Sequence, residues 1–132
     1  MTTVVLDTNV LVSALFNPHG PSSQILNLIL SNTIMVCLDE RIRYEYREVL
    51  LRDKFGFDPK AVDDLIDFFD QEGLYITATP FAWQWPDHAD AKFLEVAVAA
   101  QAGYLITGNL KHYPANTIKH LKIIAPARFL GI

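Results

Sequence analysis

The sequence predicts an α/β protein with three layers, α/β/α, in which helices cover both faces of a central, mostly parallel sheet. Two observations predict this class. Short runs of apolar and β-branched residues alternate along the chain with longer segments whose apolar residues recur at helical spacing. The short runs are also apolar throughout, which is typical of parallel strands buried on both faces.

The expected elements follow from these runs in chain order. Strands are expected over residues 2–6, 33–38, 74–77, 104–107 and 121–124. Helices are expected over residues 10–16, from 21 onward, 39–52, 58–72 and 89–102, with a last helical turn from 126. Asp39 and Asp58 are suitable N-caps for their helices, and Gly73 is a suitable end for the helix before it. Residues 80–85 are expected to be irregular.

Length and composition restrict the class of protein. A chain of 132 residues with 51% hydrophobic and 20% charged residues suits one globular domain over residues 1–132. Its net charge of −4 is unfavourable for a general nucleic-acid coat protein, because phosphate binding relies on Lys and Arg. It remains compatible with an enzyme that meets phosphate through a bound cation.

The cysteine count and the hydropathy pattern indicate the cellular compartment in which we expect the protein. The single cysteine, Cys37, excludes an intramolecular disulfide and a multi-Cys zinc site, and we expect it to be a core strand residue. A reducing compartment fits this usage. No segment has the pattern of a signal peptide or a membrane span, so we expect a cytoplasmic protein without a membrane partner.

Asp7 is the first candidate site residue. It directly follows the first expected strand, and Thr8 and Asn9 add two polar groups at the same place. In open α/β sheets, ligands bind outside the carboxyl ends of the strands. The alternative role of Asp7 is to cap the helix that follows.

Two further acidic residues lie close to the apolar faces of their helices. Glu45 is on the margin of the apolar face of helix 39–52, and Asp90 shares the apolar stripe of helix 89–102. A carboxylate beside the core is costly unless a cation or hydrogen bonds compensate it. Asp87 has the alternative role of N-cap for the second helix and is a reserve candidate.

The three candidates together predict a metal site. If Asp7, Glu45 and Asp90 converge, their mutual repulsion would raise the pKa of at least one carboxyl unless a cation is present. Mg²⁺ or Mn²⁺ suits such oxygen ligands, whereas zinc would favour histidine and cysteine patterns that this chain lacks. Such an ion can activate water for attack on a phosphodiester. Asp90 or Glu45 would orient or deprotonate that water, leaving a 5′-phosphate and a 3′-hydroxyl.

Four segments, in order, resemble the motifs of PIN domains. They are VVLDTNVLVS at residues 4–13, EYREVL at 45–50, DHADAKFL at 87–94 and LITGN at 105–109. No single segment is specific, but the four occur in register over nearly the whole chain. The resemblance is to bacterial and archaeal PIN proteins regarded as toxins of toxin–antitoxin pairs, similar to VapC.

The resemblance implies a PIN-like α/β/α fold and a Mg²⁺- or Mn²⁺-dependent endoribonuclease that hydrolyses RNA. It assigns catalysis and metal ligation to Asp7, Glu45 and Asp90, with Asn9 and Thr107 as polar support. It also implies a homodimer and a cognate antitoxin protein.

One position departs from the family pattern. The family often has a fourth Asp after Thr-Gly, and this chain has Asn109 there. An amide adds no charge and ligates a cation only weakly. We therefore expect weaker metal affinity, one well-occupied ion, or partial replacement by Asp87. The alternative is an inactive PIN-like module kept for binding protein or RNA.

The remaining expectations concern RNA contacts and two other functions. Lys111 and His112 follow Asn109 in a loop beside the expected site and are candidate RNA contacts. A phosphatase with Asp7 as nucleophile usually has another Asp two residues on, where this chain has Asn9. A nucleotide-binding module would need a Gly-rich phosphate loop, and none follows a strand.

Overall fold

A computed structural model describes residues 1–80, 88–113 and 120–132 of the chain. The elements follow in the order β1 (Thr3–Leu6), α1 (Thr8–Phe16), α2 (Pro21–Leu30), β2 (Met35–Leu38), α3 (Glu40–Leu50), α4 (Pro59–Glu72), β3 (Leu74–Tyr75), α5 (His88–Ala99), β4 (Tyr104–Ile106), β5 (Lys122–Ile124) and α6 (Pro126–Phe129), with 3₁₀ turns at Asp53–Phe55 and Leu110–His112.

The strands form one parallel sheet in the order β3-β2-β1-β4-β5. The central strand is β1, where Val4 pairs with Val36 of β2 on one side and with Tyr104 of β4 on the other. The chain builds outward from β1 through β2 and β3, then crosses back to place β4 on the opposite side. The strand order therefore reverses at β1, and this switch point is where ligands bind in such sheets.

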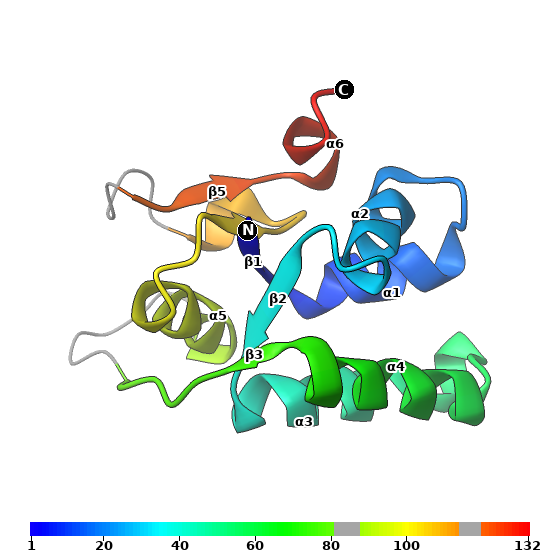
Figure 1. Cartoon of the computed structure of the whole chain (residues 1–132). Coiled ribbons are helices and arrows are strands. Elements are labelled where there is room, and N and C mark those ends of the chain that lie inside the picture. The colour runs from blue at the N-terminus through cyan, green and yellow to red at the C-terminus, as the bar shows by residue number, and fades with distance from the viewer. Residues whose placement is uncertain (81–87, 114–119) are drawn as a thin grey trace.

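Helices cover both faces of the sheet (Figure 1). The helix α5 packs against β1, β2 and β4 on one face, while α1 and α2 lie together on the other. The helices α3 and α4 pack against each other at the β3 end of the sheet, and α6 contacts α2. The predicted α/β/α fold with a parallel sheet is confirmed.

The hydrophobic core surrounds the central strand β1 of the sheet. Val4, Val5 and Leu6 of β1 are fully buried, so the strand needs no polar face. The helix α4 contributes one apolar stripe to the same core, consisting of Val62, Leu65, Ile66 and Phe69. No helix in the described residues is both long and apolar enough to cross a membrane.

The ends of several elements differ from the prediction by a few residues. The helix α1 begins at Thr8 rather than at residue 10, because Asp7 is its N-cap. The edge strand β3 ends at Tyr75 rather than at 77, because its neighbour β2 ends at Leu38 and offers no further strand backbone for pairing. The helix α5 ends at Ala99, three residues earlier than expected.

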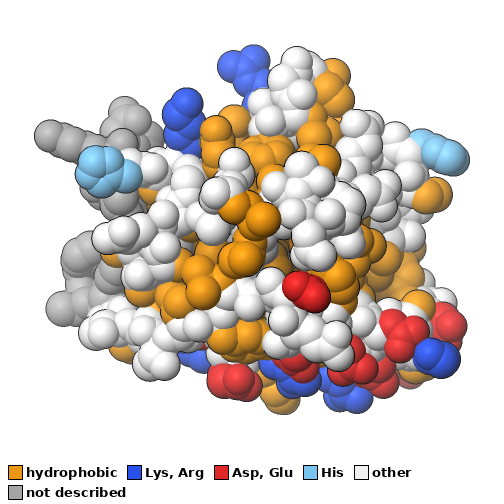
Figure 2. Space-filling model, viewed as in Figure 1, with side chains coloured by type: hydrophobic (Ala, Val, Ile, Leu, Met, Phe, Trp, Pro, Cys, Tyr) orange, Lys and Arg blue, Asp and Glu red, His pale blue; other side chains and the backbone are white. Residues whose placement is uncertain are grey.

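Salt bridges join the outer surfaces of α3 and α4, where acidic and basic side chains gather along the lower edge of the molecule (Figure 2). Arg43 forms two hydrogen bonds with Asp70, at 2.8 and 2.9 Å, and Arg47 contacts Asp63 at 3.1 Å. The hydrogen bonds from Arg43, with one from Tyr75, hold the pKa of the Asp70 carboxyl below its ordinary value. These arginines therefore pair within the protein.

Replacing Phe69 with alanine tests the core between α3 and α4. Phe69 is fully buried, and its ring centroid lies 5.8 Å from that of Tyr46. We expect Phe69→Ala to lower the free energy of unfolding by about 3–5 kcal/mol, because it leaves a cavity. The exposed Tyr44 provides the control, and Tyr44→Ala should change stability by no more than about 0.5 kcal/mol. Equal urea midpoints for the two variants would contradict this account.

Candidate active site

Asp7 occupies the carboxyl end of the central strand and is 3% exposed. Its Oδ1 accepts a hydrogen bond from the backbone N–H of Asn9 at 3.4 Å, so it does cap α1. Its Oδ2 accepts a hydrogen bond from the Thr107 hydroxyl at 2.8 Å, and the Tyr113 hydroxyl lies 3.4 Å from the same oxygen. A buried carboxylate needs such donors. The cap and the candidate site are thus the same residue.

Sheet pairing brings Asp7 and Thr107 together. The backbone N–H of Asp7 donates to the carbonyl of Ile106 at 3.0 Å, which continues the pairing of β1 with β4. Thr107 directly follows Ile106 and is fully buried. The side chain of Thr107, predicted as polar support, therefore contacts the carboxylate of Asp7 directly. Asn9 contacts that carboxylate through its backbone N–H, and its side chain is exposed.

Tyr46 fixes α3 against the end of β1. Its buried hydroxyl donates to the carbonyl of Leu6 at 2.6 Å, one residue before Asp7. Burial, together with the nearby charges of Asp7 and Glu45, raises the pKa of the Tyr46 phenol well above its ordinary value. The hydroxyl therefore stays protonated and keeps donating at physiological pH.

Glu45 extends from α3 toward both α1 and α5. Its Oε1 lies 2.8 Å from the ammonium nitrogen of Lys92, and its Oε2 accepts a hydrogen bond from the hydroxyl of Thr8. The side chain of Glu45 is 28% exposed, whereas that of Lys92 is only 14% exposed. The charge that compensates this carboxylate thus comes from a neighbouring helix of the chain itself.

Asp90 lies in the first turn of α5 and is mostly buried. Its Oδ2 is 2.6 Å from Nδ1 of His112, which belongs to the 3₁₀ turn after β4. The backbone N–H of Asn109 donates to the Thr107 hydroxyl at 2.9 Å, so the same turn is tied to the group that holds Asp7. His112, expected as an RNA contact, therefore touches a candidate ligand, while Lys111 is exposed.

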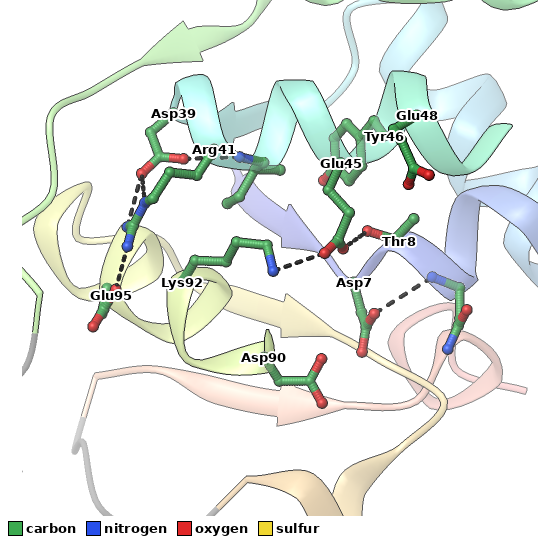
Figure 3. Close-up of polar contacts among 12 residues, drawn as sticks. Asp7, Thr8, Asp39, Arg41, Glu45, Tyr46, Glu48, Asp90, Lys92 and Glu95 are labelled. Atoms are coloured by element: carbon green, nitrogen blue, oxygen red, sulfur yellow. Dashed lines mark hydrogen bonds and ion pairs between the residues drawn. The ribbon is translucent and has the colours of Figure 1, made fainter. Parts of the chain in front are cut away.

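The three predicted acidic residues face a common space (Figure 3). The carboxylates of Asp7, Glu45 and Asp90 approach it from the end of β1, from α3 and from α5. However, the described residues contain no group of three or more His, Cys, Asp or Glu side chains placed to hold a metal ion. The acids thus share one edge of the sheet without forming a closed set of ligands. Asp87, the reserve candidate, lies outside the described residues.

An open groove of about 540 Å³ runs beside this space, between α3 and α5. Its lining consists of Glu40, Arg41, Tyr44, Glu45, Glu48 and Lys92. Tyr44 is 73% exposed. The ion pair of Glu45 and Lys92 therefore borders both the acidic space and a surface that a ligand can reach.

A salt bridge between two buried acids and Arg41 joins the N-terminal end of α3 to α5. Arg41 contacts Asp39, the N-cap of α3, at 2.8 Å and Glu95 of α5 at 2.7 Å. Both carboxylates are buried. Sequence reasoning missed this bridge, although the position of Glu95 within an otherwise apolar run of α5 was a signal of a buried acid.

Lys92 and Tyr113 are site residues that sequence reasoning also missed. Lys92 is two residues after Asp90, but its partner is on another helix, so spacing along α5 gives no signal for the contact. Burial and the charges of Asp7 and Asp90 raise the pKa of the Tyr113 phenol, which therefore remains a neutral donor. The four residues Thr107, Tyr113, Lys92 and His112 together compensate the three acids.

The structure places this protein in the class of α/β/α proteins that carry acidic residues at the switch point of a parallel sheet. Comparisons with known proteins give the family. A model described as "PIN domain" matches residues 3–111. The uncharacterized protein MJ1680 of Methanocaldococcus jannaschii is 31% identical over an alignment of 140 positions, and the alignment covers 96% of this chain and 88% of that protein. The chain therefore belongs to the PIN-domain family, as the resemblance predicted.

A solved structure shares the fold. A chain in the crystal structure of VapBC2 from Rickettsia felis, bound to a DNA fragment from their promoter, has a TM-score of 0.56 to this protein. The match covers 94% of this chain and 98% of that chain, at 16% sequence identity. The likeness thus covers a larger share of the chain than residues 3–111, which the family model matches.

The hydrogen bond between Tyr46 and Leu6 gives a test of how the site is anchored. Tyr46→Phe should lower the free energy of unfolding by about 1–3 kcal/mol, because it leaves a buried carbonyl without its donor. The control is Tyr44→Phe on the exposed face of the same helix, which should leave stability unchanged. Urea denaturation measures both, and a Tyr46→Phe variant as stable as the parent protein would refute the anchor.

Proposed function

We propose that this protein is a metal-dependent endoribonuclease that hydrolyses phosphodiester bonds of RNA. The observation that carries the proposal is that the carboxylates of Asp7, Glu45 and Asp90, from three separate elements, face a common space at the switch point of the sheet. Membership of the PIN-domain family supports a nuclease. Carboxylate oxygens are the ligands that hard divalent ions prefer, and cation-assisted hydrolysis of a phosphodiester gives such a group of acids a use.

The donor chemistry of the site fits Mg²⁺ or Mn²⁺. The side chains that face the space offer carboxylate oxygens, and hard divalent ions prefer these. Asp7, Glu45 and Asp90 would hold the ion, directly or through bound water, with Asp87 as a candidate addition. The bound ion would supply an activated water and would shield the charge of the phosphodiester.

The residues around the acids would prepare them for this role. Thr107 holds one oxygen of Asp7 and thereby fixes the direction of its carboxylate. Glu45 or Asp90 would orient or deprotonate the attacking water. Asn109 provides an amide where the family often has a carboxylate, so we propose a single well-occupied ion.

The proposed substrate and partners follow from the family and from the surface. Lys111 is exposed beside the site and is proposed to contact RNA, together with His112. The fold shared with a chain of the VapBC2 structure supports a toxin role with a cognate antitoxin protein. A homodimer acting in the cytoplasm belongs to the same proposal.

A second candidate is an inactive PIN-like module that binds protein or RNA. Two observations favour it: Asn109 replaces an acid, and the described residues contain no ready-made set of three metal ligands. Calorimetric titration with Mn²⁺ separates the candidates, because an inactive module should show no binding that depends on Asp7.

Replacing Asp7 tests the nuclease directly. We expect Asp7→Asn to lower the rate of cleavage of single-stranded RNA in Mn²⁺ or Mg²⁺ at least about 100-fold, because it removes a charge needed beside the ion. The control is Asp64→Asn, since Asp64 is exposed on α4 and pairs with Lys60. Circular dichroism spectra of both variants should match that of the parent protein, which shows that the fold is kept. Cleavage that survives both Asp7→Asn and a chelator would rule out the proposed activity.

A further inference from the structure

Lys92 places a positive charge beside one of the three candidate acids. Its ammonium lies 2.8 Å from Oε1 of Glu45, and its nitrogen is also 4.9 Å from the centroid of the Phe93 ring. The side chain is only 14% exposed, so the ammonium has lost much of its hydration. A lysine in this setting is costly unless a partner charge compensates it.

The carboxylates of Glu45 and Asp7 are held in different ways. Both oxygens of Glu45 have close partners from other helices, Lys92 on Oε1 and Thr8 on Oε2. In Asp7, the Thr107 hydroxyl holds Oδ2, whereas the described contact to Oδ1 is one long bond of 3.4 Å from a backbone N–H. A cation can therefore approach Asp7 without competing with an ion pair, whereas at Glu45 it meets a carboxylate whose charge is already paired with the Lys92 ammonium.

The formal charge of the site agrees with this difference. The formal charges of the three carboxylates and of the Lys92 ammonium add up to a charge equal and opposite to that of a single divalent ion. Asn109 adds no further negative charge. A second dication would meet a site already neutralised, and the Lys92 ammonium would repel it.

We propose that Lys92 is a built-in cation that serves in place of a second metal ion. It holds Glu45 away from direct ligation, so that one divalent ion binds through Asp7 and Asp90, and it offers its ammonium to a substrate phosphate. Lys92 lines the open groove beside Tyr44, so a phosphate lying in that groove can reach it. This inference rests on the proposed nuclease function.

The first test is a calorimetric titration, in which Mn²⁺ is added to the metal-free protein and to its variants. Asp7→Asn should weaken Mn²⁺ binding at least about tenfold, because it alters a direct ligand. Glu45→Gln should change the Kd for Mn²⁺ less than about threefold, because a side chain that contacts the ion only through water contributes little to its affinity. Lys92→Met keeps the apolar stem beside Phe93 and removes the charge, so it should tighten Mn²⁺ binding at least about threefold. Lys92→Arg should bind Mn²⁺ as the parent protein does.

The second test measures RNA binding without metal. In a chelator, the affinity for single-stranded RNA falls with salt, and each lost phosphate contact lowers the slope of that plot by about 0.7. Lys92→Met should show this decrease, while Lys92→Arg should not. The matched control is Lys60→Met, since Lys60 also pairs with a carboxylate, that of Asp64, but is 80% exposed on α4. It should leave the slope unchanged.

The outcomes distinguish this inference from the proposed function. If Mn²⁺ binding is lost equally in Glu45→Gln and Asp7→Asn, Glu45 is a direct ligand and the role of Lys92 is refuted, while the nuclease proposal stands. An unchanged salt slope in Lys92→Met refutes the phosphate contact. If the parent protein binds no Mn²⁺, the nuclease proposal and this inference both fail. Should Lys92→Met not fold, Glu45→Gln and Lys92→Arg still decide the question.

Discussion

The placement of β1 between β2 and β4 is the constraint on which the rest of this structure depends. Parallel pairing on both sides buries the strand and makes its carboxyl end the point where the strand order reverses. Asp7 is the next residue, and its own N–H continues the pairing with β4. The hydroxyl of Tyr46 reaches the carbonyl before it. The position of Asp7 thus follows from backbone pairing, and the Tyr46 side chain holds α3 beside it.

The electrostatics of the site follow from that burial. A carboxylate near the core is tolerated only when donors or cations compensate it. Here the compensation comes from side chains on other elements: Thr107 for Asp7, Lys92 for Glu45 and His112 for Asp90. Any metal ion that binds must compete with these contacts or use what they leave open. Asn109 contributes an amide without charge at a position where PIN domains often have an acid.

The helices that carry the acids are also held relative to one another. Arg41 joins the N-cap of α3 to Glu95 of α5, and Arg43 joins α3 to α4 through Asp70. A site on packed helices keeps its geometry better than one on loops. Arg41 and Arg43 therefore contribute to the site by fixing the helices that frame it.

The sequence by itself determined the order of elements, the parallel sheet, and Asp7, Glu45 and Asp90 as candidate site residues. It could do so because hydrophobic periodicity and helix caps are local signals, and an acid on an apolar face stands out within one helix. Only the tertiary structure decided the partners of these acids, such as Lys92 for Glu45 and His112 for Asp90. Those contacts depend on how α3, α5 and the turn after β4 pack together. No local pattern encodes the direction in which a long side chain crosses from one helix to another.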